Sequence, residues 1–95
     1  MDITKCLTTS TAHITLETRH KLEFEEIFND MGLTVYKKSR LGYWIYIPED
    51  FLESDRMEIP FDLWRCMFVA YENDCRWLCL DRDGMEIKLL PTYDW

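Results

Sequence analysis

The stretch Ser10-Thr11-Ala12-His13 holds the side chains of this sequence that are best suited to chemistry. A hydroxyl beside an imidazole is the pair that nucleophilic catalysis uses, and a carboxylate must then orient the ring. Only folding could bring up a carboxylate, and the candidates are Asp81, Asp83 and Asp94. Because no nucleophile motif with a fixed structural context is present, the pattern favours loop hydrogen bonds and helix capping. A small hydrolase or transferase is the alternative.

A metal site is the next candidate chemistry. The segment Asp81-Arg82-Asp83-Gly84 follows an apolar run, and two carboxylates in an Asp-x-Asp pattern can hold magnesium together with a phosphate. Asp-Gly is also a strong turn dipeptide, which favours a tight turn here. Cys75 and Cys79 are separated by three residues, and His13 and His20 lie at no zinc-finger spacing. We therefore predict no metal and no cofactor.

Aromatic residues form two groups that could contact a partner. Tyr43 and Trp44 lie in a predicted strand, and Tyr93-Asp94-Trp95 end the sequence. Stacking platforms for RNA have basic surroundings, whereas the surroundings here are acidic, so exposed rings are better suited to a protein interface. The final residues either dock on the sheet or are presented to a partner, and docking is favoured because exposing a tryptophan is costly. The predicted partner-binding residues are Tyr43, Trp44, Tyr93, Asp94 and Trp95.

The net charge limits the class of partner. The 95 residues carry 18 acidic and 11 basic side chains, which is a formal net charge of −7. Such a field repels phosphate backbones and anionic lipids and attracts basic surfaces. The composition thus predicts no direct binding to nucleic acid or membrane. A basic protein partner, mimicry of DNA toward a DNA-binding protein, and a simple role in solubility are all compatible with it.

Targeting signals and cysteines indicate the compartment. The residues from Met1 to Cys6 lack the basic and apolar regions of a signal peptide, and no run of about 18 apolar residues is present. We therefore predict a cytoplasmic protein. Thiols stay reduced in that compartment, so the cysteines are expected to behave as small, partly buried hydrophobes: Cys6, Cys66, Cys75 and Cys79.

The elements that must position these residues follow from hydrophobic periodicity and turn residues, and the length and 47% apolar content predict a single domain over residues 1–95. Predicted strands cover 3–11, 33–37, 43–47 and 76–80, predicted helices cover 15–31 and 60–73, and a short final strand is expected over 85–90. The order strand, helix, strand, strand, helix, strand matches the split βαβ arrangement called ferredoxin-like. We therefore expect an α+β fold in which two helices cover an antiparallel sheet. A different strand order would produce the same string of elements.

Four stretches of the sequence also carry a family resemblance: Ser10-Thr11-Ala12-His13-Ile14-Thr15, Gly42-Tyr43-Trp44-Ile45-Tyr46-Ile47, Cys75-Arg76-Trp77-Leu78-Cys79-Leu80-Asp81-Arg82-Asp83-Gly84, and Leu90-Pro91-Thr92-Tyr93-Asp94-Trp95. Together they resemble a family of small acidic bacterial proteins, a domain of unknown function carried largely on plasmids and integrative elements of gut bacteria. Members are often encoded near conjugation or anti-restriction genes. The resemblance implies a genomic setting, and it implies no catalytic residues.

The leading functional hypothesis is a non-enzymatic accessory protein of a mobile genetic element. It would bind a host or element-encoded protein through its acidic surface and exposed aromatics, since charge and size suit binding. A sharper version is an inhibitor of a nucleic-acid-binding defence enzyme, with carboxylates placed like phosphates. The alternative is the hydrolase or transferase built on Ser10 and His13 with a C-terminal Asp. A homodimer formed through a sheet edge or the aromatic residues is also left open.

Overall fold

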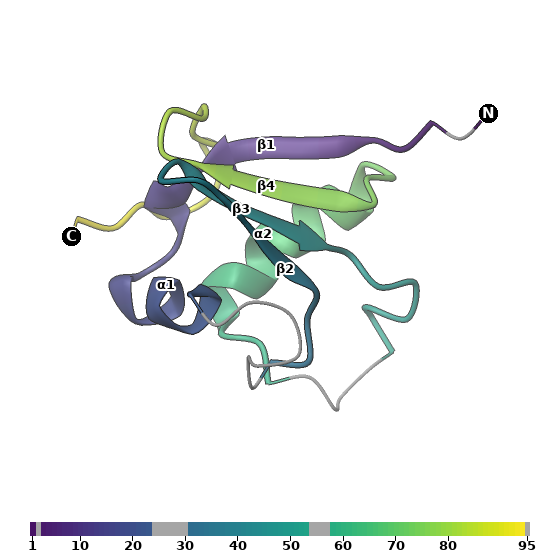
Figure 1. Cartoon of the computed structure of the whole chain (residues 1–95), viewed down its shortest axis with the longest axis horizontal. Helices are drawn as coiled ribbons and strands as arrows, with labels where there is room; N and C mark the ends of the chain where they lie inside the picture. Colours follow the sequence, from purple (N-terminus) through teal and green to yellow (C-terminus); the bar gives the residue numbers. More distant parts are fainter. Residues whose placement is uncertain (2, 24–30, 54–57, 95) are drawn as a thin grey trace.

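A computed structural model of the chain describes residues 1, 3–23, 31–53 and 58–94. The elements in chain order are β1 (Cys6–Ser10), the 3-10 turn η1 (Thr11–His13), α1 (Leu16–Leu22), β2 (Val35–Lys38), β3 (Gly42–Tyr46), α2 (Phe61–Glu72) and β4 (Trp77–Asp81). Figure 1 shows the four strands as one sheet with α2 behind it. The predicted α+β class and the predicted order of two helices and four strands are confirmed.

The strand order corrects the predicted topology. The sheet runs β1-β4-β3-β2, with β1 parallel to β4 and the other two pairs antiparallel. It is therefore a mixed sheet, and the expected antiparallel, ferredoxin-like sheet was wrong. The difference in hydrophobicity between β1 and β4 explains this order, because a central strand has neighbours on both edges and is the more buried one. Leu78, Cys79 and Leu80 of β4 are fully buried, whereas the threonine-rich β1 lies at the edge.

The predicted strand over 85–90 is also wrong. This segment has no strand pairing and lies against the end of β1 through single contacts. The amide of Ser10 donates to the carbonyl oxygen of Met85 at 3.2 Å, and the Thr9 hydroxyl donates to the same oxygen at 2.7 Å. Gly84 makes this approach possible, because an added Cβ there would lie 2.5 Å from the Thr9 carbonyl oxygen. The segment after β4 is thus held by one backbone hydrogen bond, by the Thr9 hydroxyl and by the close approach at Gly84.

Helix α1 is anchored to α2 through a buried carboxylate. Thr15 caps α1 by accepting a hydrogen bond from the Thr18 amide at 3.2 Å. Asp62, in the first turn of α2, accepts from the Thr15 amide at 2.7 Å and from the Thr18 hydroxyl at 2.8 Å. The start of α1 is therefore fixed against α2. The second half of the predicted helix over 15–31 falls mostly on residues 24–30, outside the described residues.

The hydrophobic core lies between the helices and one face of the sheet. The buried side of α2 presents Leu63, Met67 and Ala70, and the sheet presents four inward-facing residues from three strands: Val35, Ile45, Leu78 and Leu80. Leu22 of α1 belongs to the same cluster. Successive strand residues point to opposite faces, so the neighbours of these residues lie on the other side of the sheet. No helix of the described residues covers that side, which faces the viewer in Figure 1.

Candidate interaction surface

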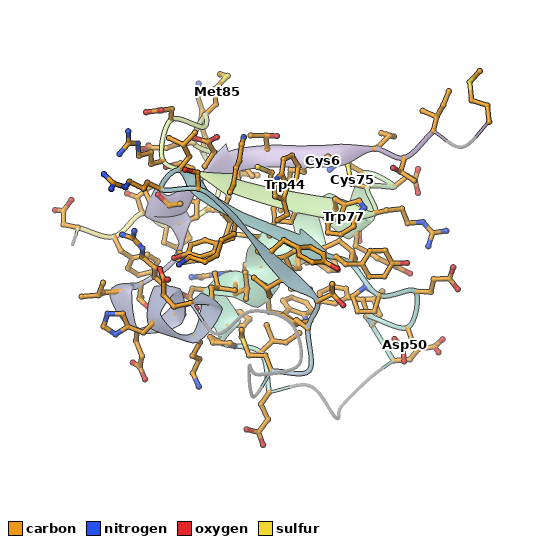
Figure 2. All side chains as sticks on the ribbon, viewed as in Figure 1. Cys6, Trp44, Asp50, Cys75, Trp77 and Met85 are labelled. Carbon is orange, nitrogen blue, oxygen red and sulfur yellow. The ribbon has the colours of Figure 1, made fainter. Side chains whose placement is uncertain are left out.

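The side of the sheet that no described helix covers carries four aromatic rings. They are Tyr36 from β2, Trp44 and Tyr46 from β3, and Trp77 from β4, and together we call them the aromatic face. The strand register brings them together, since Tyr36 lies opposite Trp44 and Tyr46 lies opposite Trp77. Figure 2 shows Trp44 and Trp77 on this side of the sheet. Three strands thus contribute to one surface.

The rings of the aromatic face contact one another and remain open to solvent. The Tyr46 and Trp77 rings lie 5.3 Å apart, centroid to centroid, at 71°, which is the edge-to-face geometry that aromatic pairs prefer. Tyr36 lies 6.2 Å from Trp77 and is 44% exposed, and the other three side chains are half-buried. The Lys38 ammonium lies 5.1 Å from the Trp44 ring centroid. The face is therefore ordered by its own contacts and already accepts one cation.

Cysteine thiols flank the aromatic face without becoming reactive. Cys6 is exposed at the start of β1, and Cys79 is buried on the same side of the sheet as Trp77. Burial raises the pKa of both thiols, and it raises the pKa of the core thiol Cys66 to about 12. Reactive cysteines need a lowered pKa. These thiols are accordingly protonated near neutral pH.

Tyr43 lies on the opposite side of the sheet from Trp44. It is 3% exposed, its hydroxyl donates to Glu23 at 2.5 Å, and it accepts from Arg19 Nε at 3.2 Å. Burial raises the pKa of the Tyr43 hydroxyl. The aromatic face therefore contains Trp44 without Tyr43, and it contains Tyr36, which the sequence did not single out. The alternation of side chains along the predicted hairpin was the signal that could have assigned Tyr43 and Trp44 to opposite sides of the sheet.

The candidate nucleophile stretch is held by backbone contacts. His13 is 1% exposed; its Nδ1 lies 2.8 Å from the carbonyl oxygen of Pro91, and its Nε2 accepts from the Ile87 amide at 2.8 Å. These partners place the proton on Nδ1. The Ser10 hydroxyl accepts from the Ala12 amide at 3.0 Å as the cap of η1. Among the residues that the structure describes, neither ring nitrogen contacts a hydroxyl or a carboxylate, and the contacts present cap η1 and anchor the C-terminal residues.

The three candidate carboxylates do not gather around His13. Asp81 pairs with Lys38 at 2.8 Å and accepts from the Asp83 amide at 2.8 Å within a turn that the Gly84 amide closes. Asp83 and Asp94 are exposed. Within the described ranges, no three histidine, cysteine or acidic side chains form a metal-binding group. The Asp-x-Asp segment thus forms a tight turn.

The Lys38–Asp81 pair predicts an acid-dependent loss of stability. The Lys38 ammonium, followed by the Asp83 amide, lowers the pKa of Asp81 below its ordinary value of 3.8. Because the folded pKa is the lower one, the stabilisation is present above the unfolded pKa and is lost as pH falls through the folded pKa. We expect the difference in unfolding free energy between wild type and Asp81→Asn to shrink from about pH 6 to about pH 2. Urea titrations at each pH measure it, and a difference that does not change with pH would contradict the assignment.

The C-terminal residues dock beside η1 and α2. The Tyr93 amide donates to the Ala12 carbonyl oxygen at 2.8 Å, and the Tyr93 hydroxyl accepts from Arg65 of α2 at 2.8 Å. The contact of His13 Nδ1 with the Pro91 carbonyl oxygen holds the same segment. Tyr93 is half-buried and Asp94 is exposed, while Trp95 is outside the described residues. The described residues of this segment therefore contact η1 and α2.

Comparison with known proteins identifies a family without an activity. Residues 6–95 match a family model described as the C-terminal domain of a family of unknown function, DUF5983. No curated protein and no solved structure matches the chain. In the part of the chain that the structure describes, no helix has the length and apolar character needed to cross a bilayer.

Proposed function

Since the chain belongs to the DUF5983 family, whose function is unknown, we propose a function from its own geometry: it is a non-enzymatic interaction module whose aromatic face binds a basic protein. The observation that carries this proposal is the sheet face that no described helix covers, with Tyr36, Trp44, Tyr46 and Trp77. Tryptophan and tyrosine dominate the binding energy of protein interfaces, especially near the centre of the contact. The four rings supply such a centre.

The charge of the chain supports a basic partner. A net charge of −7 attracts cationic surfaces over long distances and accelerates their encounter. At short distance, aromatic ring faces attract lysine and arginine by about 0.5–2 kcal/mol each. The Lys38 ammonium over the Trp44 ring is an internal example of this contact. A partner that presents lysine or arginine beside an apolar patch would match both properties.

The finer proposal concerns the setting of the interaction. The sequence motifs resemble proteins carried on plasmids and integrative elements, so we place the module among the accessory proteins of mobile elements. Its partner is then a basic, nucleic-acid-binding protein of the host or of the element. In the most specific form of the proposal, that partner is a defence enzyme. Mimicry of DNA by surface carboxylates stays a prediction.

The proposal is tested by capture with matched variants. The immobilised full chain is incubated with lysate of the organism that carries the gene, and captured proteins are identified by mass spectrometry. The variant is Tyr36→Thr/Trp77→Thr, which keeps β-forming residues on both strands, with Tyr36→Thr alone as a milder version. The control is Phe61→Ser, because Phe61 is a 66% exposed aromatic on α2. Circular dichroism confirms that each variant folds.

The expected result is one basic protein retained by wild type and by Phe61→Ser and lost with the aromatic-face variants. With the purified partner, we expect the Kd of the double variant to be about 30-fold or more above that of wild type, as for loss of a hot-spot ring. We also expect binding to weaken as the salt concentration rises. Retention of the partner by the double variant would contradict the proposal. Self-association that the double variant abolishes, with no other protein bound, would replace it with a homodimer.

A further inference from the structure

Strand β1 forms one end of the sheet, so only one of its two edges pairs with a strand. The sheet order is β1-β4-β3-β2, and Figure 1 shows β1 along the upper rim. On the β4 side, the Lys5 carbonyl oxygen accepts from the Arg76 amide at 3.0 Å. On the outer side, the Ser10 amide donates to the Met85 carbonyl oxygen at 3.2 Å. Because the backbone groups of successive residues alternate between the two edges of a strand, the even-numbered residues here face outward.

The open part of this outer edge is short. Its residues are Thr4, Cys6 and Thr8. Within the described part of the chain, their outward amides and carbonyl oxygens have no hydrogen-bond partner. The next outward position is occupied, because the Ser10 amide and the Thr9 hydroxyl both donate to the Met85 carbonyl oxygen. Among the described residues, the open run therefore extends from Thr4 to Thr8 and is symmetric about Cys6.

The outer edge of β1 lacks the features that prevent pairing with another chain. Exposed strand edges usually carry charged side chains, a proline or a bulge. Between Cys6 and Ser10 there is no charged residue and no proline, and the pairing with β4 continues residue by residue. The other end strand, β2, carries Lys37 and Lys38. The edge of β1 is therefore the one suited to pairing with a further strand.

We propose that β1 pairs in antiparallel orientation with β1 of a second copy of this chain, with Cys6 facing Cys6. In this register Thr4 of each copy faces Thr8 of the other, and each facing pair exchanges two backbone hydrogen bonds. Threonine pairs on neighbouring strands stabilise a sheet. Lys5 lies opposite Leu7 of the second copy, so no like charges face each other. The edge is thus complementary to itself.

The position of Met85 favours this register over its neighbours. A shift that placed Cys6 opposite Thr8 would bring Thr4 against Ser10, where the Met85 backbone already lies. A shift by a single residue would place outward-facing backbone groups opposite groups that face β4, and their hydrogen bonds would be lost. The register centred on Cys6 keeps the whole open run paired.

The pairing would join two four-stranded sheets into one continuous sheet. The two-fold axis of an antiparallel pair is perpendicular to the sheet, so the aromatic faces of both copies lie on the same side. The inference does not depend on what that face binds. Two copies with a net charge of −7 each repel one another, and salt screens this repulsion. Rising salt therefore strengthens self-association, whereas it weakens the binding of a basic partner.

The test is analytical ultracentrifugation of the full chain over a range of concentrations. Because the contact is small, we expect a Kd for dimerisation of about 10–100 µM. Thr8→Pro removes an outward amide that the fold itself does not use and should raise this Kd about tenfold or more. Thr4→Pro does the same from outside the assigned strand. Thr8→Val is the matched control, because it keeps the backbone groups and a β-forming side chain, and it should change the Kd about threefold at most.

Crosslinking through Cys6 tests the register. The Cα atoms of a hydrogen-bonded antiparallel pair lie about 5.5 Å apart, so a bis-maleimide with a short spacer should link the two Cys6 thiols at mildly alkaline pH. The other cysteines are buried, and Cys6→Ser should abolish the product. Thr8→Pro should reduce the product in proportion to the dimer that is lost.

The outcomes separate this contact from the proposed function. The Tyr36→Thr/Trp77→Thr protein should dimerise like wild type, because its substitutions leave the edge of β1 unchanged. A chain that stays monomeric at about 1 mM, well above the expected Kd, would overturn the inference. Self-association that both proline variants leave unchanged, or that yields no Cys6 crosslink, would overturn it as well. Circular dichroism confirms that each variant folds.

Discussion

Replacing Gly42 with alanine is expected to lower the free energy of unfolding by on the order of 3 kcal/mol or more. A Cβ atom at this position would lie 1.6 Å from the carbonyl oxygen of Leu80 and 2.7 Å from its carbonyl carbon. Both are backbone atoms of β4, so β3 and β4 would have to separate where Gly42 faces Asp81. Urea unfolding, monitored by tryptophan fluorescence and circular dichroism, measures the loss. The expected fall in Tm is about 4–8 °C for each kcal/mol.

Gly32→Ala is the matched control for this substitution. Gly32 has a φ of 72°, but an added Cβ there meets no atom within 4 Å. Its cost is therefore the backbone strain alone, about 1–2 kcal/mol for a left-handed residue. A Gly42→Ala protein no less stable than Gly32→Ala would contradict the close approach of the two central strands.

Replacing His13 with alanine is expected to lower the free energy of unfolding by about 3 kcal/mol and to release the C-terminal residues. The Ile87 amide and the Pro91 carbonyl oxygen lose their partners, and each buried polar group left without a hydrogen bond costs about 1–3 kcal/mol. The emptied space beside Ile14 and the tail adds a cavity term. Hydrogen exchange at the Ile87 and Tyr93 amides should accelerate more than exchange at β4. Exchange and urea unfolding together measure the effect.

His20→Ala is the control for the histidine substitution. His20 is an exposed residue of α1, and surface substitutions of this kind change stability by about 0.5 kcal/mol or less. If His13→Ala left exchange of the tail amides unchanged, the anchoring role of the imidazole would be wrong. The same variant bears on the hydrolase alternative, since a structural histidine changes tail exchange whether or not any substrate is present.

The cavity lined by Arg19, Arg40 and Arg82 and the aromatic face differ in how much of them could be predicted from the sequence. The two-residue alternation of strands separates Tyr43 from Trp44 and Tyr36 from Lys37 once the hairpin register is known. Each half of the hairpin therefore carries one set of side chains for each side of the sheet. The sequence contained no signal for this cavity, because Arg19, Arg40 and Arg82 come from three separate segments. Only folding gathers them.

The sequence by itself determined the kinds of elements and their order. Period-3.6 and period-2 hydrophobic patterns are local, and so are caps such as Thr15 and turns such as Asp81-Arg82-Asp83-Gly84. Tertiary structure decided which strand lies at the centre, because the string of elements is the same for several strand orders, and the burial of Leu78 and Leu80 is a property of the whole sheet. It also decided that the partners of His13 are Ile87 and Pro91, more than seventy residues away. Long-range contacts depend on the sheet order, and local patterns carry no information about it.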